Sequence, residues 1–105
     1  MRKSKAIATF TVKKETHSVR ATAHALQRME EREVSPETVL SGILALQMDR
    51  VNEYKESEED VAIIDKRNNC TIIISFQKNT IQIVTVINNS DVWVKDGTQI
   101  ERLIA

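Results

Sequence analysis

The chain has 105 residues, of which 41% are apolar, and its 15 basic and 15 acidic side chains give a formal net charge of zero. This length and composition predict one domain, residues 1–105, with a modest core built mainly from Ile, Val and Leu, because only four residues are aromatic. A neutral chain offers no general electrostatic attraction to nucleic acid, and the single cysteine, Cys70, excludes an internal disulfide.

The charges are segregated along the chain. Residues 1–34 hold eight Lys and Arg against four Asp and Glu, residues 35–65 hold two against eight, and residues 66–105 hold five against three. The basic first third could meet a phosphate backbone, whereas the acidic block at residues 56–60 could face a basic partner or form a solvated loop. No secretory or membrane-spanning segment is predicted, because charged residues interrupt the apolar stretch near the N-terminus, and we expect a cytoplasmic protein.

The N-terminal part is expected to contain a tail, a strand and a helix. Residues 1–5 are predicted as a flexible basic tail. Residues 6–12 alternate in part and are predicted as an extra short N-terminal strand. Residues 18–33 are predicted as the first helix, with Thr16 or Ser18 as its N-cap.

This expected first helix is amphipathic. At about 100° per residue, Val19, Leu26 and Met29 fall on one side. The opposite side carries His17, Arg20, His24, Arg28, Glu31 and Arg32. Such a face is either a phosphate site, with an imidazole between basic groups, or an ordinary solvated helix face.

A strong start signal predicts the second helix. Ser35 is suited to the N-cap, Pro36 to the first helical position, and Glu37 to the positive end of the helix dipole. Residues 16–47 are therefore expected to form the helical part of the domain. Gly42 lies inside the second helix, where it could allow the two helices to approach closely.

Beyond residue 49, apolar residues recur at about every second position, as in strands, and no longer at the spacing of a helix. Strands are predicted at residues 50–55, 61–65, 70–76, 80–87 and 91–95. Short polar connections rich in Asn predict hairpins, so residues 50–95 are expected to form an antiparallel meander. Residues 98–105 are left as a C-terminal tail that could dock as a strand or a helical turn. The predicted fold is α+β, with two N-terminal helices packed on one face of a four- or five-stranded antiparallel meander sheet.

Several motifs of enzyme sites are missing from the sequence. The two glycines are isolated, so a glycine-rich phosphate loop is excluded. The two histidines and Cys70 lack the spacing of metal ligands, and no metal or other cofactor is expected. Cys70 is interpreted as a small apolar residue of the core, not as a nucleophile.

The segment from His24 to Val39 resembles the opening of a small bacterial and phage domain family of unknown function. The family pattern runs His-Ala-x-x-Arg-Met-x-x-Arg-x-Ile and continues into an acidic start of a second helix. That family is placed with the RelE-like group of ribonuclease toxins, which includes barnase, EndoU and colicins. The resemblance covers about residues 18–88. Glu33 stands where the family usually has glycine, so the turn between the helices is expected to be made differently.

The resemblance implies a toxin-type, metal-independent endoribonuclease, or a descendant of one, that uses the 2′-hydroxyl of RNA as the nucleophile. His24 would transfer the proton, because imidazole changes its charge near neutral pH. Arg28 and Arg32 would hold the scissile phosphate, because the guanidinium fork matches two oxygens. Further contacts with the RNA would come from Arg20, His17, Gln82, Thr85, Ser75 and Trp93.

Two alternatives stay open at this point. His24 and Arg28 lie one helical turn apart and could have a structural role. The protein could also be a non-catalytic phage or mobile-element protein that binds or inhibits a host protein, with the acidic block at residues 56–60 and the strand edge at 91–95 as contact surfaces. Expected partners are therefore RNA, an antitoxin or a host protein, with no membrane. Homo-oligomers could form through the strand that contains Trp93.

Overall fold

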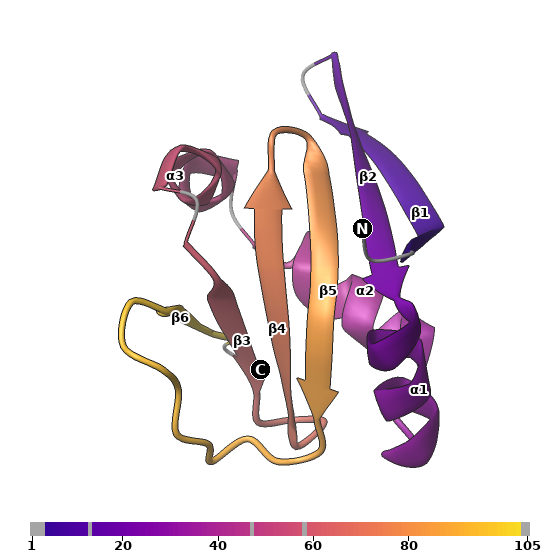
Figure 1. Cartoon of the computed structure of the whole chain (residues 1–105). Coiled ribbons are helices and arrows are strands. Elements are labelled where there is room, and N and C mark those ends of the chain that lie inside the picture. The colour runs from indigo at the N-terminus through magenta and orange to yellow at the C-terminus, as the bar shows by residue number, and fades with distance from the viewer. Residues whose placement is uncertain (1–3, 13, 47, 58, 104–105) are drawn as a thin grey trace.

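The structure is a computed structural model that describes residues 4–12, 14–46, 48–57 and 59–103. It contains three helices and six strands in these ranges (Figure 1). In chain order the elements are β1 Ser4–Val12, β2 Glu15–Thr22, α1 Ala23–Glu31, α2 Pro36–Leu44, α3 Met48–Ser57, β3 Val61–Asp65, β4 Cys70–Gln77, β5 Thr80–Ile87 and β6 Gln99–Arg102.

The six strands form one mixed sheet in the order β1-β2-β5-β4-β3-β6. Strand β2 pairs in parallel with β5, and β3 in parallel with β6, while the other neighbours are antiparallel. The fold is α+β, but the predicted antiparallel meander on two N-terminal helices is wrong. Consecutive hairpins join only β3, β4 and β5. The three helices, β3 and β4 all lie between β2 and β5 in the chain, and this long connection allows β2 and β5 to pair in parallel.

The predicted helix at residues 18–33 is wrong in its first part, which belongs to β2. His17, Val19 and Ala21 are buried, whereas Ser18 and Arg20 between them are half-buried, and this alternation is that of a strand. The helix begins only at Ala23. Its N-cap is Thr22, whose hydroxyl accepts a hydrogen bond from the amide of Ala25 at 3.0 Å, and not Thr16 or Ser18.

Strand β1 corresponds to the expected N-terminal strand and pairs with β2 as a hairpin. It begins at Ser4, so Ser4 and Lys5 of the expected basic tail belong to the sheet. Residues 1–3 of that tail lie outside the described residues.

The predicted start of the second helix is confirmed. Ser35 is the N-cap of α2 and Pro36 is its first residue. Gly42, however, faces the sheet and not α1, because a Cβ added to it would lie 2.9 Å from Cδ1 of Ile72. The small residue therefore allows close packing of α2 on the sheet.

Two of the predicted strands are wrong. Residues 50–55 lie in α3, because Val51 and Tyr54, three positions apart, both enter the core on one helical face. Residues 91–95 belong to the irregular connection between β5 and β6. The last strand is instead formed within the predicted C-terminal tail. There the amide of Gln99 donates to the carbonyl of Asp60 at 2.8 Å.

All three helices cover the same face of the sheet. The core combines side chains from this face of the sheet with Ala25 and Met29 of α1, Val39 and Ile43 of α2, and Val51 and Tyr54 of α3. Figure 1 shows α2 behind β4 and β5. Within the described residues, no helix packs on the opposite face, which is called the open face below. None of the described helices has the length and apolar character needed to cross a membrane.

Candidate nucleic-acid interface

The middle of the open face carries a row of polar side chains from three neighbouring strands. Arg20 of β2 is in register with Gln82 of β5, and Gln82 is in register with Ser75 of β4. The next residues along β2 and β5, Ala21 and Ile83, are buried in the core. Because neighbouring residues of a strand point to opposite faces, the Arg20–Gln82–Ser75 row points away from the helices.

Polar residues continue on both sides of this row. On one side, Ser18 is in register with Thr80, and Thr80 with Gln77. On the other side lies Thr85, which pairs with Ile73 beyond an irregularity between β4 and β5. Hydroxyl and amide groups therefore surround the guanidinium of Arg20 on this face of the sheet. Such groups bind phosphate oxygens and base edges of nucleic acids.

The far end of the open face, toward β3, is closed. Ala62 and Ile64 alternate with core residues of β3, yet both are buried. Thr71, in register with Ile64, donates its hydroxyl to the carbonyl of Asn89 in the β5–β6 connection at 2.7 Å. The accessible polar area is therefore the part formed by β2, β5 and the second half of β4.

His24 follows β2 in the chain, in the first turn of α1, and is exposed. The chain passes from Arg20 on the open face through the Thr22 cap to His24 within four residues. The first turn of α1 contains no acidic residue. The junction of β2 and α1 thus combines an imidazole, a guanidinium and the positive end of a helix dipole.

The two other predicted catalytic residues are engaged within the protein. Arg28 forms an ion pair with Glu31 at 2.8 Å. The guanidinium of Arg32 donates to the carbonyl of Val86 at 2.6 Å, and this hydrogen bond holds the end of α1 to β5. Neither interaction directs these arginines to the Arg20–Gln82–Ser75 row. The contacts of Arg32 are those of a residue that positions α1.

His17 is separated from the other predicted site residues. It is fully buried on the core side of β2, and its ring stacks on Phe10 with a centroid distance of 5.1 Å. Its Nε2 lies 3.3 Å from Nζ of Lys55, which also donates to Oδ1 of Asn79 at 2.6 Å. Its Nδ1 has no hydrogen-bond partner among the described residues. These contacts join the β1–β2 hairpin to α3, so His17 is not exposed to RNA.

Trp93, predicted to contact RNA or to lie in an interface, is 85% exposed in the β5–β6 connection. It is not placed on the strand predicted for it. Sequence reasoning also missed Ser18, Thr80 and Gln77 as neighbours of the candidate site. These three residues alternate with the buried residues of β2, β4 and β5, and this alternation could have indicated their position on the open face.

Other reactive groups of the chain lie away from the open-face row. Burial raises the pKa of the Cys70 thiol to about 11, and the negative charge of Asp65 acts in the same direction. The thiol is therefore protonated near neutral pH and is a poor nucleophile. Among the described residues, no three His, Cys, Asp or Glu side chains are grouped so that they could hold a metal ion.

Comparison with known proteins gives no relative for this chain. No family model, no curated protein and no solved structure matches it.

Proposed function

We propose that this protein acts on RNA as a RelE-like, metal-independent endoribonuclease or as a descendant of one. The observation that carries the proposal is the Arg20–Gln82–Ser75 row on the open face. Arg20 is suited to a phosphate, the amide of Gln82 to the edge of a base, and the hydroxyl of Ser75 to either. His24, next to this row along the chain, is the exposed group suited to proton transfer.

The chemistry follows from the substrate. The 2′-oxygen of the RNA forms a bond to phosphorus while the bond from phosphorus to the 5′-oxygen breaks. His24 takes the proton of the 2′-hydroxyl, and the leaving 5′-oxygen takes a proton from solvent. The products are a 2′,3′-cyclic phosphate and a 5′-hydroxyl. Arg20 balances the negative charge that accumulates on the phosphoryl oxygens.

The experiment compares binding and cleavage of a fluorescein-labelled single-stranded RNA in the presence of EDTA. His24→Ala is expected to abolish cleavage and to leave RNA affinity unchanged within a factor of about two, because the residue transfers a proton. Arg20→Gln is expected to weaken binding by about three- to ten-fold and to reduce the salt dependence by about one phosphate contact. A DNA of the same sequence lacks the 2′-hydroxyl and should stay intact.

Arg67→Gln is the matched control, because Arg67 is an exposed cation in the β3–β4 turn, away from the row. Its RNA affinity is expected to equal that of the wild type. The ribonuclease proposal is wrong if folded wild-type protein leaves RNA intact, or if cleavage persists in His24→Ala. The proposed RNA surface is wrong if Arg20→Gln and Arg67→Gln bind RNA equally.

A second candidate function is binding of a host protein without catalysis. The observation that favours it is the exposure of Trp93 in the β5–β6 connection, together with the position of β6 as an edge strand of the sheet. Edge strands and exposed Trp are common elements of protein interfaces. Trp93→Ala in a pull-down from host extract separates the two candidates. Loss of a specific partner, together with intact RNA in the cleavage assay, would favour host-protein binding.

A further inference from the structure

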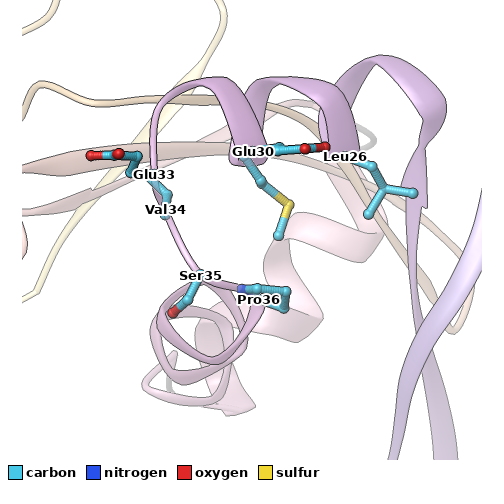
Figure 2. A pocket seen from close by; sticks show the side chains of 7 residues that line it. Leu26, Glu30, Glu33, Val34, Ser35 and Pro36 are labelled. Atoms are coloured by element: carbon cyan, nitrogen blue, oxygen red, sulfur yellow. The ribbon is translucent and has the colours of Figure 1, made fainter.

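A pocket of about 440 Å³ lies where α1 ends and α2 begins. It belongs to the helical side of the protein and shares no residue with the Arg20–Gln82–Ser75 row. Its apolar lining consists of Leu26, Met29, Val34 and Pro36, and its polar lining of Glu30, Glu33 and Ser35. Figure 2 shows Leu26 and Glu33 at opposite ends, with the carboxylate of Glu33 directed outward.

The wall of the pocket is formed by a tight turn at the end of α1. The amide of Val34 donates to the carbonyl of Met29 at 2.9 Å, and the amide of Glu33 to the carbonyl of Glu30 at 3.2 Å. This pair of bonds is the Schellman motif, in which the residue at the position of Glu33 takes a left-handed conformation. The φ of Glu33 is 55°, a conformation that favours glycine.

The two carboxylates at the pocket, Glu30 and Glu33, have no hydrogen bond or ion pair among the described residues. The nearby cations are engaged elsewhere, Arg28 with Glu31 and Arg32 with the carbonyl of Val86. Negative charges at the C-terminal end of a helix are also unfavourable to the helix dipole. The pocket is therefore an apolar surface flanked by negative charge that the described part of the chain does not neutralise.

Because of this charge, we propose that the pocket docks a basic segment of a partner protein through one apolar side chain. The apolar side chain, a Leu, Met or Phe, enters between Leu26 and Pro36. Flanking Lys or Arg residues of the segment pair with Glu30 and Glu33. The charge on the pocket favours a cationic segment over a neutral or acidic one, and it raises the association rate. Keeping Glu33 in a glycine-like conformation costs stability, which is consistent with a use for its carboxylate.

Fluorescence anisotropy with short labelled peptides tests this proposal. The probes are Lys-rich peptides with a single central Leu, Met or Phe. Matched peptides replace the central residue by Ser, or all the Lys residues by Glu. At least one probe is expected to bind, less tightly at high salt, while both kinds of matched peptide bind weakly or not at all. Glu30→Gln and Glu33→Gly are each expected to weaken binding by about three- to five-fold, and together by about tenfold.

The Glu33→Gly variant makes the test independent of folding, because glycine favours the turn and keeps the pocket intact. Glu56→Gln is the control, because it removes an exposed carboxylate of α3 that does not line the pocket. This variant should bind the probe like the wild type. The proposal is overturned if no probe binds, or if small hydrophobic amines bind and the peptides do not. It is also overturned if the Glu30→Gln and Glu33→Gly variants bind as tightly as Glu56→Gln. None of these outcomes bears on the proposed RNA cleavage, because His24 and the Arg20–Gln82–Ser75 row are not part of the pocket.

Discussion

The hydroxyl of Tyr54 in α3 donates a hydrogen bond to the carboxylate of Glu101 in β6. Arg50, one turn earlier in α3, also donates to this carboxylate from Nε at 2.7 Å. Burial, together with the hydrogen bond to the negatively charged Glu101, raises the pKa of Tyr54 to about 12. Burial also acts to raise the pKa of Glu101, but the hydrogen bonds from Tyr54 and Arg50 outweigh it and lower that pKa.

Alkaline titration of Tyr54 is therefore expected to report the packing of α3 on β6. The pKa of the folded protein lies above the ordinary value of 10.0, so folding favours the neutral phenol. The contribution of the raised pKa of Tyr54 to the free energy of unfolding is complete below pH 10 and is lost as the pH rises through about 12. Tyr54 is the only tyrosine, so ultraviolet absorbance of the phenolate measures this residue alone.

Glu101→Gln is the variant that checks the cause of this shift. Loss of the negative charge is expected to move the tyrosine midpoint toward 10 without reaching it, because burial still acts on the phenol. A midpoint near 10 in the wild-type protein would show that Tyr54 is not packed against Glu101.

Glu33→Gly is expected to stabilise the protein. Glycine adopts the left-handed φ of 55° without the strain of a Cβ, so the free energy of unfolding should rise by about 0.5–1 kcal/mol. Urea unfolding followed by circular dichroism gives the measurement. Glu33→Ala keeps a Cβ and should not gain this stability. If Ala stabilises as much as Gly, loss of negative charge at the helix end explains the effect, and the turn does not.

The turn at Glu33 is of a kind that usually contains glycine. Glu33 takes a positive φ and belongs to a Schellman motif although it carries a Cβ. The two backbone hydrogen bonds and the contact of Val34 with the core compensate for the strain.

Local signals were sufficient for some elements of the fold. Ser35 and Pro36 predicted the start of α2 because their side chains act on the backbone next to them. The buried strands β3, β4 and β5 were predicted because their runs of β-branched residues are short and bounded by polar turns. The parallel pairings of β2 with β5 and of β3 with β6 join distant segments, and no local pattern encodes them.

Individual residues of the candidate site could be predicted from the sequence, but their arrangement in space could not. Arg20 and Gln82 were both named from the sequence, and their register across β2 and β5 is a property of the folded sheet. Residues 18–22 were predicted as helix because their only strongly apolar residue, Val19, also fits a helical stripe. The alternation becomes visible once His17 is counted as a core residue.

Gly42→Val is expected to destabilise the protein through the contact of α2 with the sheet. A Cβ at this position already comes within 2.9 Å of Ile72 Cδ1, and two more methyl groups would force α2 outward. The expected loss is about 2–3 kcal/mol. Ser41→Val places the same side chain at the exposed neighbouring position of α2 and should lose less than about 1 kcal/mol. Equal losses in the two variants would mean that Val acts through helix propensity alone.

Cys70 is expected to resist alkylation in the folded protein. Its thiol is buried and its pKa of about 11 leaves little thiolate at pH 8. Iodoacetamide should therefore label the native protein much more slowly than protein unfolded in urea, as measured by mass spectrometry. Rapid labelling of native protein would show that the β3–β4 hairpin opens or that the thiol is activated.

Substitution of the two histidines is expected to have opposite effects on stability and on RNA cleavage. His17→Ala removes a ring that is fully buried and stacked on Phe10, and it removes a contact of Lys55. The loss of stability should be about 2–3 kcal/mol, because a cavity remains while the unpartnered Nδ1 is also removed. His24→Ala changes an exposed residue and should shift stability by less than about 0.5 kcal/mol. Urea unfolding of the two variants measures this difference in stability.

RNA cleavage separates the two variants in the reverse sense, since under conditions where both are folded only His24→Ala should be inactive. A His17→Ala protein that is as stable as the wild type would contradict the buried position of His17. A folded His17→Ala protein that has lost cleavage would mean that His17, and not only His24, takes part in the reaction.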